Sequence, residues 1–264
     1  MLKYVSAGQK ADEPIREASV GEYRWNISEF AAGFDAAAEH IHPYYVELQD
    51  RILDMIPFGR DAEFLLVDAG GGSGRFVEKF LNRYSRARAI IIDQSAAFLA
   101  LAERRLTAFG PRAECRLARL QDHWTNDLSQ APAAIVSMSA IHHLEPAGKR
   151  DLYRRCSEAL QPAGVFINAD EVRPADDADY LARCRAWVAH KSRAMDAGLI
   201  PASIHPALRQ WEERNVRRFG EPRKSGDDCH ETVEAQVGYL SACGFPRVEC
   251  TWHKEMWAIL FGLM

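Results

Sequence analysis

The chain has 264 residues, of which 47% are hydrophobic and 27% are charged, so it can form a sizeable core and is not disordered throughout. Its 33 Lys and Arg against 37 Asp and Glu give a net charge of −4, which argues against a globally basic nucleic-acid binder. No apolar run is long enough to span a bilayer, the N-terminus lacks the apolar stretch of a secretory signal, and no cysteines form a C-x-x-C pair. These features predict a cytoplasmic protein with reduced thiols.

The first 60 residues divide into two predicted segments. Residues 1–20 are polar and mixed in charge, and we expect them to be a flexible leader. Residues 21–60 are expected to form a helical cap, because apolar residues recur there along one helix face: Ile41, Tyr45, Leu48, Ile52 and Ile56. Pro43 suits the first turn of the helix that carries most of them, and Pro57-Phe58-Gly59 ends it.

From residue 61 onward, short apolar runs alternate with helical patterns. Strands are predicted at 64–67, 89–93, 113–120, 134–138 and 165–168, with helices between them at 76–84, 95–109 and 146–160. Residues 171–230 interrupt this order and are expected to form a helical lid, followed by a helix at 231–242 and an antiparallel strand pair at 247–255 and 257–264. We therefore predict an α/β fold with a doubly wound, seven-stranded, mostly parallel sheet, whose core comprises residues 61–170 and 231–264.

The stretch from Asp68 to Gly74 lies between a predicted strand and a predicted helix and is rich in glycine. Glycines there let the backbone turn tightly and bring helix N–H groups close to a ligand. The dinucleotide fingerprint G-x-G-x-x-G fails, because Arg75 and Val77 stand where its last glycine would be. The spacing D-x-G-x-G-x-G fits instead, and its acid suits a ligand with an ammonium group, such as S-adenosylmethionine (SAM), better than a pyrophosphate.

Over about residues 40–264 the sequence resembles the class I SAM-dependent methyltransferases. Asp93 follows the second strand, where the acid of this family accepts both ribose hydroxyls, and the run from Ile135 to Leu144 is similar to the family's fourth motif. Leu160-Gln161-Pro162-Ala163-Gly164 is similar to the turn before strand five. The resemblance implies SAM as cofactor, S-adenosylhomocysteine (SAH) as product, and these cofactor-binding residues: Tyr45, Asp68, Gly70, Gly71, Gly72, Gly74, Asp93, Gln94, Leu120 and Met138.

The third motif of the family departs from its usual form. Arg119 stands where an acid beside adenine is expected, in the run from Ala118 to Asp122. Either Asp122 takes that role in a shifted register, or backbone and apolar contacts alone hold the adenine.

Four residues are candidates for a general base: His142, His143, Glu171 and His230. Neutral histidine is the best base near pH 7, and Glu171 follows strand five at the sheet edge that faces a ligand. The histidine pair also has a purely structural interpretation, as a packing or capping element after strand four. We expect no metal, because the His40-x-His42 spacing turns its side chains to different faces and the cysteines lack ligand spacing.

The predicted function is methyl transfer from SAM to a small-molecule acceptor, anionic or aromatic in character, without nucleic acid or membrane as partner; a homodimer stays open. A second interpretation is an enzyme that acts on SAM itself, because Phe34-Asp35, Leu144-Glu145-Pro146 and His230-Glu231-Thr232 are similar to carboxy-SAM synthases. The arginine on which those enzymes rely would be Arg214 or Arg218. A third is a non-catalytic SAM-binding regulatory protein.

Overall fold

The computed structural model describes residues 24–224 and 227–264, so the predicted leader at 1–20 lies outside the described residues. Seven strands form one sheet in the order β3-β2-β1-β4-β5-β7-β6. Their bounds are β1 Leu65–Ala69, β2 Arg88–Asp93, β3 Ala113–Leu117, β4 Ala134–Met138, β5 Val165–Glu171, β6 Arg247–Lys254 and β7 Trp257–Leu263. The first five strands are parallel, and β7 runs antiparallel to both β5 and β6, as predicted. The third strand is shorter than predicted and ends at Leu117.

Helices cover both faces of the sheet, which confirms the doubly wound arrangement. Their bounds are α1 Ser28–Ile41, α2 Tyr45–Met55, α3 Arg75–Arg83, α4 Ala96–Leu106, α5 Pro146–Ala159, α6 Asp177–Asp196, α7 His205–Glu212 and α8 Val233–Ala242. Helices α2, α3 and α4 pack in one hydrophobic cluster with one face of the sheet, and α5 and α8 pack in a second cluster with the other face. No helix in the described ranges is both long and apolar enough to cross a membrane.

Local sequence explains the elements that border the central sheet edge. All five residues of β1 are buried, as expected of a central parallel strand covered on both faces. Ser95 caps α4 by accepting a hydrogen bond from the backbone N–H of Phe98, which satisfies one free donor of the first turn. Because β1, β4 and β5 are parallel, the loops that follow them leave the sheet at the same edge, which is where ligands bind in such folds.

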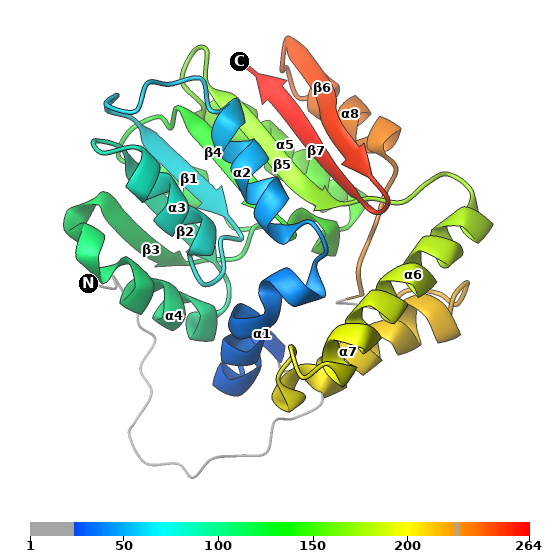
Figure 1. Ribbon diagram of the computed structural model, residues 1–264. Helices are drawn as coiled ribbons and strands as arrows, with labels where there is room; N and C mark the ends of the chain where they lie inside the picture. The colour runs from blue at the N-terminus through cyan, green and yellow to red at the C-terminus, as the bar shows by residue number, and fades with distance from the viewer. Residues whose placement is uncertain (1–23, 225–226) are drawn as a thin grey trace, which may run out of the picture.

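Helices α1, α6 and α7 lie together beyond the carboxyl ends of the parallel strands (Figure 1). Two side chains of α6 fasten it to the end of α1: Trp187 Nε1 donates to the carbonyl of Ile41 at 2.7 Å, and His190 Nε2 contacts the carbonyl of His40 at 2.8 Å. The last carbonyls of a helix lack hydrogen-bond partners within that helix, so the side chains of α6 provide partners that α1 alone cannot. The division of the chain into cap, lid and core as separate units stays a prediction.

Candidate active site

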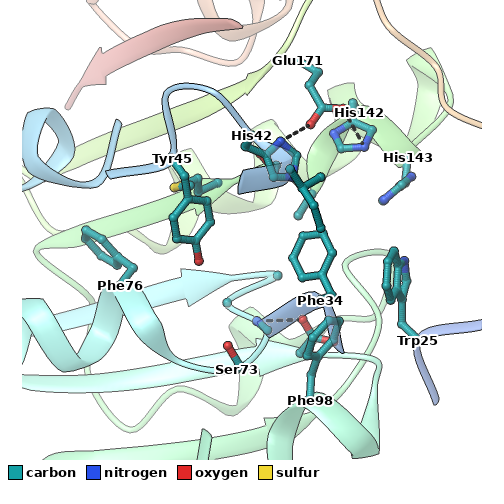
Figure 2. Close-up of a pocket in the computed structure, with 18 of the residues that line it drawn as sticks. Trp25, Phe34, His42, Tyr45, Ser73, Phe76, Phe98, His142, His143 and Glu171 are labelled. Carbon is teal, nitrogen blue, oxygen red and sulfur yellow. Dashed lines mark hydrogen bonds and ion pairs between the residues drawn. The ribbon is translucent and has the colours of Figure 1, made fainter. Parts of the chain in front are cut away.

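A cavity lies at the carboxyl ends of the strands, between the loop after β1 and helices α1, α6 and α7. Figure 2 shows His42, His142 and Glu171 grouped at one end of this cavity, with Ser73 and Phe98 at the other. The two ends differ in chemistry, because glycines, acids and aromatic rings form one and a cluster of histidines and carboxylates forms the other.

The glycine loop adopts a conformation that ordinary side chains would prevent. Gly70 has φ +81°, and a Cβ there would lie 2.4 Å from Cβ of Ala140. Gly72 also has a positive φ, and its N–H donates to Oδ2 of Asp93 at 2.9 Å. The N–H of Ser95 donates to Oδ1 of the same carboxylate at 2.8 Å, so Asp93 is held in place at the cavity wall from two sides.

Two buried acids face this end of the cavity. Burial, together with repulsion from Asp93, raises the pKa of Asp68 to about 8. Burial also raises the pKa of Asp93, although the backbone N–H donors of Ser95 and Gly72 limit the rise to about 6. A cationic ligand would favour the ionised form of both acids, so this end of the cavity suits a cation.

Helix α1 is fastened to the glycine loop by Asp35. Its carboxylate accepts a hydrogen bond from Ser73 Oγ and an ion-paired one from Arg105 Nη2, the latter at 2.9 Å. Beside it, Phe34 packs edge-on against Trp25 and Phe98, with ring centroids 5.0 and 5.9 Å apart. The helix thus adds an aromatic wall next to Asp93, which suits a flat base or ring.

At the other end, His142 packs against the last residues of β5. Its backbone N–H donates to Asp170 Oδ2 at 2.8 Å, and its ring Nδ1 lies 2.7 Å from Asp170 Oδ1. This arrangement turns Nε2 toward Glu171, whose Oε2 is 3.3 Å away. The same Oε2 lies 3.3 Å from Nε2 of His230, and Oε1 lies 3.6 Å from Nδ1 of His42.

The charges of this cluster are strongly coupled. Burial alone would lower the pKa of His142, but the Glu171 and Asp170 carboxylates raise it to about 10. Burial would raise the pKa of Glu171, but the charge of His142 and the hydrogen bond from His230 bring it down to about 2. For His42, burial outweighs the opposing charge of Glu171 and lowers the pKa to about 4.

The lid adds a buried acid and a buried base. Trp211 Nε1 donates to Oδ2 of Asp228 at 2.7 Å, and Nδ1 of the half-buried His143 lies 3.1 Å from Oδ1. Lys191 Nζ lies between two tryptophan rings, 4.0 Å from the centroid of Trp187 and 3.7 Å from that of Trp211. Burial lowers the pKa of Lys191 to about 7. Lys191 is the only lysine or arginine among the described residues that line the cavity.

Most of the residues singled out from the sequence meet at this cavity. Those that line it are Tyr45, Asp68, Gly70, Gly71, Gly72, Asp93, Met138, His142, His143 and Glu171. Four others do not: Gly74, Gln94, Leu120 and His230. Gly74 precedes α3 as its N-cap, where a Cβ would press on Ile91 and Ala102, and His230 lies behind the cavity wall, bonded to Glu171. Asp122 is bonded to Arg119 at the surface and does not line the cavity.

Sequence reasoning missed His42, Lys191 and Asp228 as members of this site. His42 was considered only with His40, as a metal-binding pair that was rejected, and the other two lie in the charged lid, where no periodic pattern distinguishes them. The two lid arginines that could have reached the cofactor do not line this cavity. Arg214 pairs with Asp227 at 2.8 Å and Arg218 with Glu221, and both line a neighbouring hollow rather than this cavity.

Comparisons with known proteins agree with the fold and the glycine loop. Residues 66–164 match the model of a methyltransferase domain. A carboxy-S-adenosyl-L-methionine synthase from Nautilia profundicola is 23% identical over 144 residues, which are 54% of this chain and 60% of that protein. The chain thus spans less than two thirds of the length of this curated relative.

Solved structures share the fold at low identity. An O-methyltransferase family 2 protein from Planctomyces limnophilus, in complex with apigenin, has a TM-score of 0.59 at 17% identity, covering 93% of this chain and 63% of that one. PigF with SAH has a TM-score of 0.59 at 13% identity, covering 93% and 64%. Residues 66–164 thus match a methyltransferase domain, and the seven-stranded sheet that contains them is shared with solved SAM-dependent methyltransferases.

Proposed function

We propose that the protein transfers a methyl group from SAM to a small-molecule acceptor bound in the same cavity. The observation that carries this proposal is the continuity of the cavity, which extends from the glycine loop and Asp93 to the histidines and tryptophans under the lid. A cofactor at one end and an acceptor at the other would meet inside it, shielded by α1, α6 and α7.

The residues at the glycine end fit SAM. Asp93, oriented by the Gly72 and Ser95 amides, can accept the ribose hydroxyls, and the buried Asp68 supplies a negative charge for the ammonium group. The wall of Trp25, Phe34 and Phe98 offers apolar contacts to the adenine. When bound, SAM supplies an electrophilic methyl group on a sulfonium, whose departure needs no acid.

The protein's own contribution is to position the acceptor and to take its proton. Holding two reactants in line can supply several kcal/mol of the barrier reduction by itself. His143 is the proposed proton acceptor, because it is half-buried, borders the cavity and lies 3.1 Å from the Asp228 carboxylate, whose charge favours the protonated ring. The ion-paired His142 and Glu171 are more deeply buried and support the cavity wall.

The lid suggests the class of acceptor. Lys191 offers an ammonium group to an anionic substituent, and Trp187 and Trp211 offer flat apolar faces to a ring. An acceptor that is both aromatic and anionic would use all three. Cytoplasmic location, the absence of nucleic-acid and membrane partners, and a homodimer remain predictions.

The proposed function is tested by incubating the protein with SAM and a panel of aromatic and aliphatic acids while SAH formation is measured. The expected result is SAH release with at least one acceptor, lost in Asp93→Ala and reduced in His143→Ala. A matched control is His205→Ala, because His205 bonds to the carbonyl of Ile200 and does not line the cavity. Full turnover in His143→Ala would show that His143 is not the proton acceptor. Binding of SAM without SAH formation from any acceptor would favour a regulatory role.

A carboxy-SAM-forming enzyme is the second candidate, favoured by the 23% identity to such a synthase. The placement of Arg214 and Arg218 outside the cavity weakens it, since the expected arginine would have to reach the cofactor. Mass spectrometry of the copurified cofactor separates the two, because carboxy-SAM is heavier than SAM.

A further inference from the structure

The cluster under the lid has a second property that methyl transfer does not require. His142, Asp228 and His230 each present a ligand atom, and these atoms lie within 4.8 Å of one another. All three residues are buried. Three atoms 4.8 Å apart lie about 2.8 Å from their common centre, so shifts of at most about 0.7 Å would bring all three to bond lengths near 2.1 Å.

Glu171 completes the set. Its Oε2 lies 3.3 Å from Nε2 of His142 and 3.3 Å from Nε2 of His230. Neighbouring ligands of an octahedral ion with bonds near 2.1 Å lie about 3 Å apart, which is close to both distances. Two imidazoles and two carboxylates therefore face the same small volume.

The outer atoms of these ligands are already held. His142 Nδ1 lies 2.7 Å from Asp170 Oδ1, His230 Nδ1 lies 2.6 Å from the hydroxyl of Tyr180, and Asp228 Oδ2 accepts the N–H of Trp211 at 2.7 Å. Metal-binding histidines characteristically donate their other ring N–H to such a partner, which fixes the tautomer and the ring orientation. Each side chain is thus turned so that its second atom faces the centre.

The cluster also holds carboxylate oxygens that are short of partners. Oε1 of Glu171, the oxygen on the side of His42, and Oδ1 of Asp228 are buried without a hydrogen bond, since the approach of His143 to Asp228 lacks hydrogen-bond geometry. Buried carboxylate oxygens are costly unless they are paired or coordinate a metal. An oxygen with two lone pairs can bind an ion and still receive His143.

The charge of the surroundings points the same way. Asp170, Glu171 and Asp228 are three buried carboxylates, and the buried Lys191 interacts with two of them, Glu171 and Asp228. The carboxylates outnumber this lysine, so the surroundings suit a cation.

We propose that His142, His230, Asp228 and Glu171 bind a divalent first-row transition metal ion at the lid end of the cavity. Mixed imidazole and carboxylate ligands suit Zn²⁺, Fe²⁺, Co²⁺ and Mn²⁺ better than Mg²⁺ or Ca²⁺, which prefer oxygen alone. The proposal departs from the expectation of no metal, because that expectation considered residues close in sequence and these ligands come from three separate segments. The site stands independently of the proposed methyl transfer.

The test is Co²⁺ binding to the full-length protein after chelator treatment and dialysis. Titration followed by visible absorption and by elemental analysis is expected to give about one Co²⁺ per chain, with Zn²⁺ competing and Mg²⁺ not. His142→Gln and His230→Gln should weaken binding at least tenfold, while His205→Gln, outside the cavity, should not. Circular dichroism and SAM binding of each variant report separately on its fold and its glycine end.

A subtler pair of variants keeps all four ligands. Tyr180→Phe removes only the hydroxyl that holds His230 and should weaken Co²⁺ binding about tenfold. Tyr153→Phe removes another buried hydroxyl, bonded to Gln236 in the core, and should leave Co²⁺ binding unchanged. If the glutamine variants do not fold, this pair decides the matter.

Two results would overturn the proposal. One is the absence of Co²⁺ and Zn²⁺ binding to the wild-type protein, and the other is equal binding by Tyr180→Phe and Tyr153→Phe. If the protein transfers methyl groups but binds no metal, only the proposal of a metal site is refuted. If it binds metal but transfers no methyl group, only the proposed function is refuted.

Discussion

Binding of SAM should release a proton from the protein, and Asp68 is its source. Burial and the neighbouring Asp93 raise the pKa of Asp68 to about 8, so its carboxyl is largely protonated at neutral pH when no ligand is bound. An ammonium group favours the ionised form, so Asp68 must lose its proton to bind it. At pH 7 a group of pKa 8 carries about 0.9 of a proton, whereas Asp93, with a pKa of about 6, adds only about 0.1.

Calorimetric titration with SAM in two buffers of different ionisation enthalpy measures this release. We expect about one proton at pH 7 for the wild type and almost none for Asp68→Asn. Because only the ionised fraction binds well, the affinity of the wild type should rise about tenfold from pH 6 to pH 7, and that of Asp68→Asn much less. Equal proton release in the two proteins would refute the assignment of the ammonium group to Asp68.

The same carboxyl makes the ligand-free protein sensitive to alkali. Its pKa is higher in the folded than in the unfolded chain, so the stability that it contributes is complete below about pH 4 and is lost as the pH rises toward 8. The melting temperature without SAM should therefore fall over this range, and Asp68→Asn should flatten the fall. A profile that is identical in both proteins would contradict the burial of an ionisable group here.

Three further changes probe other parts of the cavity. Gly70→Ala should abolish SAM binding, because its Cβ would meet Cβ of Ala140 at 2.4 Å; adding Ala140→Gly should restore part of the binding measured by calorimetry. Asp35→Ala should lower the free energy of unfolding by about 2 kcal/mol, seen in urea denaturation, because Arg105 loses its ion pair with Asp35 and keeps only that with Glu78; an unchanged midpoint would show that α1 is held otherwise. Lys191→Met should raise KM for anionic acceptors while leaving SAM affinity unchanged, and equal KM values would exclude Lys191 from acceptor binding.

The fold and the cofactor end of the cavity could be predicted because their signals are local. A short apolar strand, a glycine loop and an acid after the next strand occupy fixed positions in a parallel sheet, and Asp68, Gly72 and Asp93 meet as expected. The lid end could not be predicted in this way. His142 and Asp228 approach each other only through the path of the lid, and that path depends on packing between α1, α6 and α7 rather than on any repeating pattern.

The two contacts that join α6 to the end of α1 bear on how such a protein could acquire a new acceptor. Trp187 and His190 of α6 supply partners for the Ile41 and His40 carbonyls at the end of α1. Replacing the lid segment alone would therefore leave these two carbonyls without hydrogen-bond partners. Trp187 also forms part of the cavity wall, so a residue that we propose to contact the acceptor is also one that joins α6 to α1. Any redesign of specificity, by evolution or in the laboratory, therefore has to exchange both segments as a matched unit.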